Sequence, residues 1–139
     1  MSQENLDSLR RLSEAFGRRD FDRAIQGVAE DVELRPAVEG IDVDTLVRGR
    51  VELRGFWEQI NEAWQTLTFE LTEVREAPGE RLVAFERWHV SGRDGLKLEF
   101  EIITVYTFRD GLVTRIDGFR DAAEALEAVG LSEPPPKNA

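Results

Sequence analysis

The chain has 139 residues, a formal net charge of −10, no cysteine and one histidine. This length suits a single compact domain, and the acidic balance argues against nucleic-acid binding, which depends on clustered Lys and Arg. The lack of cysteine excludes disulfides, thiolate nucleophiles and sulfur-based zinc sites, and a single histidine excludes a His-rich metal site. The sequence shows neither a leader pattern nor a membrane-length apolar run, so we expect a cytoplasmic protein without membrane contact. We also expect no cofactor and no resident metal, and an ion held by oxygen ligands stays the open alternative.

The first third of the chain predicts two helices, a strand and a loop. Apolar residues recur at helical spacing over 6–16 and again over 21–28, where Asp20 can cap the second helix. Residues 31–36 alternate polar and apolar up to a proline, which indicates a short edge strand. Residues 37–48 follow no period, and their acidic residues lack the spacing of a calcium loop, so we interpret them as a solvated lid.

A third helix and a run of strands follow. Residues 53–67 carry one apolar face over about four turns, which is typical of a core helix. Strands separated by glycine-containing turns are then predicted over 68–75, 81–91, 96–108 and 113–119. The strand over 96–108 is long, so we expect it to bend or to carry a bulge.

The end of the chain predicts a short helix and a tail. Asp121 and Glu124 form the pattern of a capping box ahead of apolar residues that end near Gly130. The three consecutive prolines that follow predict disorder. We therefore expect one domain over 1–131 and a disordered Pro-rich tail over 132–139.

This order of elements indicates an α+β fold in which the helices gather on one face of the sheet. We predict a cone-shaped open barrel: a curved, mostly antiparallel sheet that wraps over about three N-terminal helices, with a short C-terminal helix. The open end of such a cone is a natural pocket. The residues that we expect to line this pocket are Arg35, Trp57, Ile60, Trp64, Phe85, Tyr106 and Asp117.

Five short phrases of the sequence carry a resemblance to a known family, and they lie at residues 17–24, 30–32, 47–50, 108–113 and 125–131. In this order and spacing they resemble the SnoaL-like branch of the nuclear transport factor 2-like superfamily. The resemblance covers about residues 4–131 and implies the cone fold and a homodimer. It implies no single reaction, because the superfamily holds ketosteroid isomerases, polyketide cyclases, epoxide hydrolases, dehydratases and members without known catalysis.

The residues at the positions of two known active sites of this superfamily do not match. Where a ketosteroid isomerase has a carboxylate before a proline, this chain has Arg35, and the approximate position of its helix tyrosine is Leu12. The resemblance places the Asp-Arg-Asp set of limonene-type epoxide hydrolases at Arg87, His89 and Gly118. Both of these mechanisms are therefore disfavoured, whereas the acid/base group of a polyketide cyclase could be His89.

Arg87 and His89 are the candidate catalytic residues. Alternation along the strand over 81–91 places both on one face and Trp88 on the other. If the first face is concave, a neutral His89 can accept a proton, and Arg87 can stabilise the anion that develops on the ligand. The carboxylate that orients His89 could be Asp31, Glu33 or Asp117. In the alternative interpretation these charges only form pairs across strands.

The same orientation turns Trp88 outward. With Ala84, Val90, Ile103 and Val105 it would form an apolar patch on the convex face of the sheet, which predicts a homodimer through that face.

The predicted function is binding of a small, mostly apolar organic molecule, with cofactor-free isomerisation, cyclisation or dehydration if the protein is an enzyme. The alternative is a non-catalytic binding or accessory module, which Arg35 and Gly118 favour because they stand where carboxylates are needed. A third hypothesis is an interaction domain whose cone is filled by its own side chains.

Overall fold

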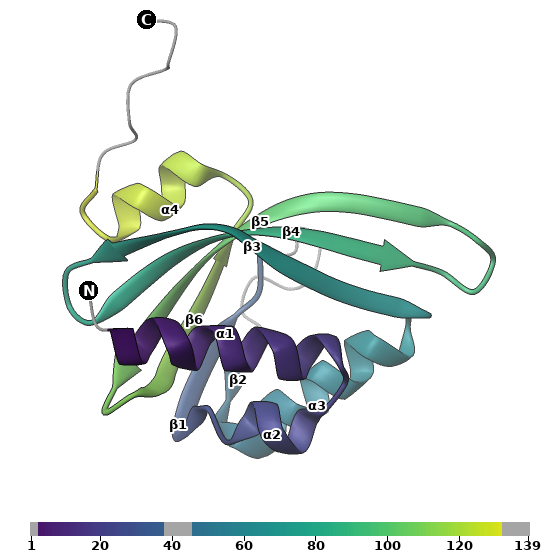
Figure 1. The fold of residues 1–139 in the computed structure, drawn as a ribbon, viewed down its shortest axis with the longest axis horizontal. Coiled ribbons are helices and arrows are strands. Elements are labelled where there is room, and N and C mark those ends of the chain that lie inside the picture. Colours follow the sequence, from purple (N-terminus) through teal and green to yellow (C-terminus); the bar gives the residue numbers. More distant parts are fainter. Residues whose placement is uncertain (1–2, 38–45, 132–139) are drawn as a thin grey trace, which may run out of the picture.

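The structure is a computed structural model that describes residues 3–37 and 46–131. Most of the predicted lid and all of the predicted tail lie outside these residues. Within them, helices and strands follow the predicted order, with the first two helices ahead of the sheet and a short helix at the end (Figure 1).

The helices are α1 (Gln3–Gly17), α2 (Phe21–Ile25), α3 (Gly49–Glu62) and α4 (Ala122–Ala128). The side chains of Asp20 and Asp121 accept hydrogen bonds from backbone N–H groups in the first turns of α2 and α4, which confirms both predicted caps. Among the described residues, no helix has the length and apolarity needed to cross a membrane.

The strands are β1 (Val28–Arg35), β2 (Val47–Arg48), β3 (Thr66–Ala77), β4 (Arg81–Ser91), β5 (Lys97–Arg109) and β6 (Leu112–Phe119). They form one open sheet in the order β2-β1-β6-β5-β4-β3, in which β1 and β6 are parallel and all other neighbours are antiparallel. The predicted α+β class and mostly antiparallel sheet are therefore confirmed.

Several boundaries differ from the sequence prediction: α3 ends at Glu62 because Thr66 already begins β3, and β1 begins earlier than expected. The second helix ends at Ile25, three residues early, and Val28 begins β1 instead. The reason is tertiary: Val28 is fully buried in the core, and the carbonyl of Gly27 accepts a hydrogen bond from the Val113 amide of β6. The two-residue strand β2 was not predicted, because so short an element leaves no period in the sequence.

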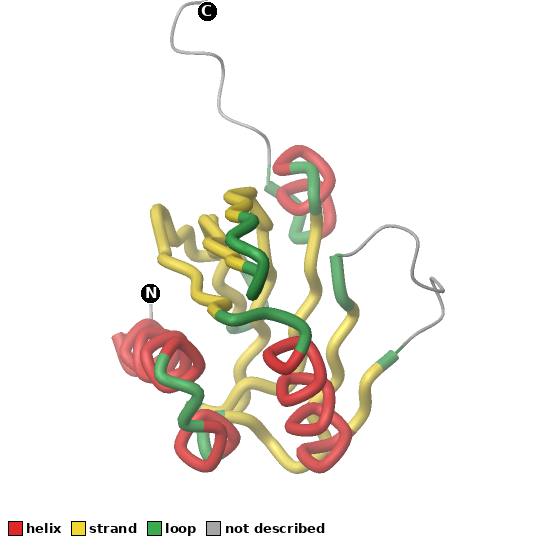
Figure 2. The backbone as a smooth tube through the Cα atoms, turned by 90° about the vertical axis from the view of Figure 1, so that its right-hand side faces the viewer, coloured by secondary structure: helices red, strands yellow, loops and turns green. Residues whose placement is uncertain are grey.

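The sheet is curved, with α1, α2 and α3 on its concave face and α4 on the opposite face (Figures 1 and 2). Register shifts between Leu71 and Glu73 in β3 and between Thr107 and Phe108 in β5 interrupt the regular pairing. The second shift confirms the irregularity predicted for the long strand. Such shifts increase the local twist and help the sheet to wrap around the helices.

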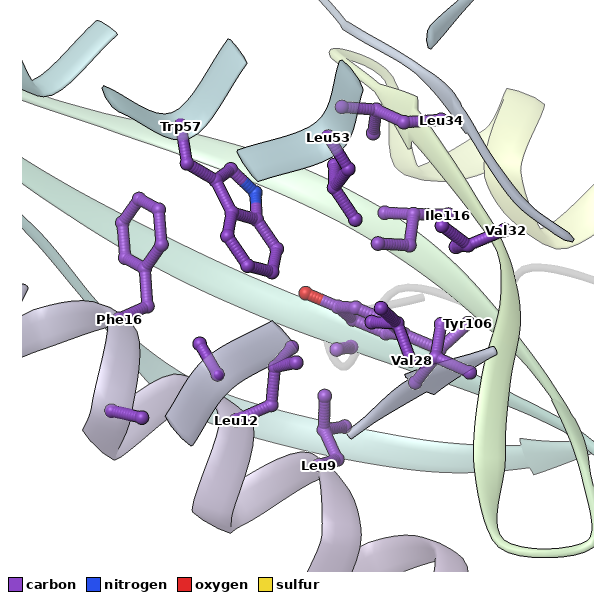
Figure 3. Close-up of a cluster of buried hydrophobic side chains, with 14 of the residues drawn as sticks. Leu9, Leu12, Phe16, Val28, Val32, Leu34, Leu53, Trp57, Tyr106 and Ile116 are labelled. Carbon is purple, nitrogen blue, oxygen red and sulfur yellow. The ribbon is translucent and has the colours of Figure 1, made fainter. Parts of the chain in front are cut away.

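Two hydrophobic clusters hold the layers together. The larger lies between the concave face and the N-terminal helices and includes Leu9, Leu12, Leu53 and Trp57 (Figure 3). The smaller lies on the other face, where Val83, Ile103, Val105 and Leu126 pack between β4, β5 and α4. Both faces of the sheet are thus apolar at the end covered by α4.

Gly118 of β6 lies close to Ala37, which follows the end of β1. A Cβ atom placed on Gly118 would lie 2.8 Å from both the backbone nitrogen and the Cβ of Ala37. We predict that Gly118→Ala lowers the free energy of unfolding by about 1–3 kcal/mol, because backbone must move to relieve this overlap. Chemical denaturation measures the change.

The matched control is Gly55→Ala on α3. A Cβ at Gly55 meets no atom within 4 Å, and alanine favours a helix, so this variant should be as stable as the parent or more stable. Equal stability of the two variants would contradict the prediction.

Candidate functional site

An apolar pocket of about 240 Å³ lies between the concave face of the sheet and helices α1 and α3. Its lining contains every tryptophan and the single tyrosine of the chain, together with several phenylalanines. These aromatic residues are Phe16, Phe56, Trp57, Trp64, Phe69, Trp88, Phe100 and Tyr106. Of the residues predicted to line the cone, the structure places Arg35, Trp57, Ile60, Trp64 and Tyr106 in this lining.

A larger groove of about 570 Å³ lies elsewhere, between α1, α2 and the turn that joins β5 to β6. Its lining is dominated by charged side chains such as Arg18, Arg23 and Asp110. Ligand sites are mostly apolar with a few placed polar groups, so the aromatic pocket is the better candidate despite its smaller volume.

Three rings form one wall of the pocket. Phe69, Trp88 and Phe100 lie opposite one another on β3, β4 and β5, with ring centroids 4.7 Å apart for the first pair and 6.4 Å for the second. Phe16 of α1 meets Trp88 edge-on at 5.7 Å and Trp57 of α3 at 6.0 Å. The helices and the sheet therefore share a continuous aromatic surface.

The packing of β4 decides which of its side chains reach the pocket. Leu82, Ala84 and Val90 belong to the core cluster on the concave face, so Glu86 and Trp88, which alternate in step with them, point the same way. The prediction that Trp88 faces outward is wrong. The predicted apolar patch on the outer face is therefore wrong as well, because Ala84 and Val90 also lie on the concave side.

Glu86 is the carboxylate of the pocket. It is only 2% exposed, and its side chain accepts three hydrogen bonds. The Tyr106 hydroxyl donates to Oε2 at 2.6 Å, while the Thr104 hydroxyl and the Trp88 indole N–H donate to Oε1 at 2.8 and 3.2 Å. Thr104 and Tyr106 can do so because β5 pairs with β4 in a register that puts them on the same face as Glu86.

Burial gives Glu86 an unusual pKa. Desolvation raises its pKa from 4.5 to about 7, although the three donors act in the opposite direction by favouring the carboxylate. The pKa of Tyr106 is raised well above its usual value of 10, first by burial and then by the nearby Glu86 charge. At neutral pH, Tyr106 therefore stays a hydrogen-bond donor, whereas Glu86 can both hold and release a proton.

Arg87 and His89 lie outside the pocket, on the opposite face of the sheet. The ring of His89 sits between two carboxylates, with Nε2 3.2 Å from Glu70 and Nδ1 3.5 Å from Glu99. Arg87 pairs with Glu99 and Glu101 at 3.5 and 3.6 Å. The concave orientation predicted for these two residues is wrong, and the alternative of charge pairs across strands describes their surroundings.

Two more predicted lining residues are also placed elsewhere. Phe85 packs against the smaller cluster on the α4 side of the sheet. Asp117 pairs with Arg115 at 3.2 Å and lies 3.8 Å from Arg35, beside the rim of the pocket and not in its lining. Within residues 3–37 and 46–131, no group of three or more metal-ligating side chains comes together.

The sequence prediction missed Glu86, Thr104 and Trp88 as pocket residues. A signal for Glu86 was present: it is the one charged residue in an alternating set of five whose other members are Leu82, Ala84, Trp88 and Val90. A lone acid in an apolar stripe is unusual, because charged groups are rarely buried without a partner.

The fold and this pocket invite comparison with known proteins. TerC crystallised with polyporic acid is 22% identical at a TM-score of 0.75, covering 91% of this chain and 98% of that one. RV0760c from Mycobacterium tuberculosis, in complex with estradiol-17beta-hemisuccinate, is 17% identical at a TM-score of 0.74, covering 86% and 95%. A ketosteroid isomerase-like protein from Catenulispora acidiphila, in complex with trimethylamine, is 13% identical at 0.70, covering 89% and 92%.

At these identities the likeness shows the fold, which is that of nuclear transport factor 2-like and ketosteroid isomerase-like proteins. The comparison with curated protein sequences gives no match. The family model of the SnoaL-like domain matches residues 9–116, which span most of the chain and its pocket. This chain, as its sequence phrases predicted, belongs to the SnoaL-like domain family.

Proposed function

We propose that this protein binds a small, mostly apolar organic molecule in the aromatic pocket and that Glu86 is the proton acceptor of a cofactor-free reaction on it. The observation that carries the proposal is a carboxylate that lines the pocket, is almost fully buried and has a pKa of about 7. A general base works best when its pKa lies near the working pH. The hypothesis of an acid/base group is thus kept, but moves from His89 to Glu86.

A single base of this kind suits an isomerisation. In the first step a C–H bond beside a carbonyl group breaks, its proton passes to Glu86, and the electron pair moves into the conjugated system of the ligand. In the second step the same carboxyl group returns the proton to another carbon, so no co-reactant is consumed. Tyr106 holds the carboxylate in place through its hydrogen bond. Its hydroxyl does not take up the substrate's proton, because its raised pKa keeps it already protonated at neutral pH.

Arg35 supports the binding of a ligand that is polar at one end. It lines the pocket at the end of β1, and its side chain is 63% exposed beside Asp117. A guanidinium at this rim can meet an oxygen-bearing group of the ligand while the apolar part lies against the rings.

A second candidate function is binding without catalysis. In the described lining, three donors, on Tyr106, Thr104 and Trp88, are already bonded to Glu86. These three groups are therefore not directed at an oxyanion on a substrate, which this chemistry needs. This observation favours a binding module in which Glu86 only anchors the ligand.

The structural neighbours support a small-molecule ligand in general terms, since their structures hold polyporic acid, a steroid hemisuccinate and trimethylamine. Two further expectations stay predictions: a cytoplasmic location and a homodimer through the outer face of the sheet. The dimer no longer has the apolar patch as its basis, because Ile103 and Val105 are buried at the α4 side.

Catalysis can be tested with a β,γ-unsaturated cyclohexenone, whose conversion to the conjugated ketone is followed by absorbance. We predict that the protein accelerates this conversion and that Glu86→Gln lowers the rate by about 100-fold or more, because the amide cannot accept the proton. The rate should rise as pH increases through about 7, where Glu86 ionises.

The matched controls are Glu70→Gln and His89→Gln on the outer face, which should both keep the parent rate. An unchanged rate in Glu86→Gln, or a loss in His89→Gln, would contradict the assignment. Quenching of tryptophan fluorescence by the ketone without any conversion would instead support the binding module.

Glu86 should also make stability depend on pH. Its pKa is raised to about 7 in the folded protein from 4.5, so between these values the folded state binds more protons than the unfolded state. The contribution of the neutral carboxyl is full below about pH 4.5 and is lost as pH rises through about 7, a change on the order of 3 kcal/mol.

We therefore predict that Glu86→Gln, which is neutral throughout, gains stability over the parent between about pH 5 and about pH 8. Urea unfolding at the two pH values measures this difference. A constant difference between variant and parent would show that Glu86 titrates at its ordinary value.

A further inference from the structure

The hydrogen bonds of Glu86 leave one of its acceptor positions open. A carboxylate has about four lone-pair positions on its two oxygens. Oε1 receives two donors, Thr104 and Trp88, whereas Oε2 receives only Tyr106. The described residues therefore supply three donors, and Oε2 can accept one more. Because Glu86 itself lines the pocket, a ligand is the natural source of the fourth donor.

No cationic side chain in the described part of the chain contacts this carboxylate. Its partners are three neutral groups, and all residues of α1 and α3 in the lining are uncharged: Leu12, Phe16, Phe56, Trp57 and Ile60. The cation in the lining, Arg35, lies 3.8 Å from Asp117, and Arg120 lies over the ring of Phe100 at 5.7 Å. Within residues 3–37 and 46–131, the negative charge of an ionised Glu86 therefore has no counterion.

The rest of the lining suits a cation with an apolar surface. Tryptophan, tyrosine and phenylalanine rings attract cations through their faces, most strongly where water is excluded. Rings from α1, α3, β3, β4 and β5 converge on the pocket, among them Phe16, Trp57, Phe69 and Trp88. The volume of about 240 Å³ is below the range of roughly 300–1,000 Å³ that is usual for drug-sized ligands, so the cation must be small.

We propose that the pocket binds a small tertiary ammonium ion, whose single N–H donates to Oε2 of Glu86 and whose three alkyl groups lie against the aromatic rings. The number of N–H groups decides the class. A tertiary ammonium has one donor for one open position, whereas secondary and primary ions bury one or two donors without a partner, which is costly. A quaternary ion keeps the charge but leaves Oε2 without its fourth donor.

This inference rests on the proposed function only in taking the aromatic pocket as the ligand site. The open position on Oε2 is also the one at which Glu86 would take a proton from carbon. A tertiary ammonium ion and a neutral substrate therefore exclude each other, and the ion should act as a competitive ligand.

The test compares four cyclohexyl compounds by calorimetry and tryptophan fluorescence at about pH 8. They are the N,N-dimethyl tertiary amine, the N,N,N-trimethyl quaternary ion, the primary amine and the neutral methyl ketone of similar size. We expect the tertiary amine to bind at least tenfold more tightly than the ketone and more tightly than the other two ions. Its affinity should fall toward about pH 6, where Glu86 takes up a proton while the amine, like a lysine, keeps its own.

Glu86→Gln should remove the preference for the tertiary amine over the ketone, whereas Glu70→Gln, which removes an exposed carboxylate, should keep it. The pH dependence of the unmodified protein tests the same point if Glu86→Gln does not fold. Equal binding of amine and ketone, or full amine affinity in Glu86→Gln, would overturn the inference and leave the proposed function standing. Failure of all four compounds to bind would overturn both.

Discussion

Alternation along β4 is the constraint on which the site depends. Its register with β5 is continuous from Arg81 to Ser91, so one set of alternate residues must face the helices and the other must face away. The burial of Leu82, Ala84 and Val90 against α1 and α3 selects the set. Glu86 lies on the same face of β4 as these three residues, so the packing of its neighbours places its side chain in the interior.

The burial of Glu86 is costly, and the structure offsets only part of that cost. Three donors bond to its oxygens, yet its pKa still rises, which means that the loss of water outweighs these hydrogen bonds. An apolar side chain at this place would ordinarily give a more stable core. Stability alone therefore does not account for a carboxylate here, and this is consistent with the binding or proton-transfer role that we propose for it.

The site uses the family's cone in a way that its known active sites did not predict. Leu12, Arg35 and Gly118 occupy the lining where the resemblance placed functional groups, and none of them is an acid or a base at neutral pH. The titratable group of this pocket comes instead from the middle of β4, held by Thr104 and Tyr106 of β5. The fold is thus shared across the family, but the chemistry depends on which strand positions carry polar side chains.

The sequence by itself determined the order of helices and strands, the caps at Asp20 and Asp121, and the family, because periodicity and turn residues act over short distances. It also favoured the correct face of β4, since four of its five inward residues are apolar. That signal was obscured because α4 buries Val83 and part of Phe85 on the other face.

Only the tertiary structure decided which face was concave, because that depends on where the helices pack against the sheet. It placed His89 between two surface glutamates and Glu86 among aromatic rings. It also joined Glu86 to Tyr106, 20 residues along the chain, through the pairing of two strands that no local pattern specifies.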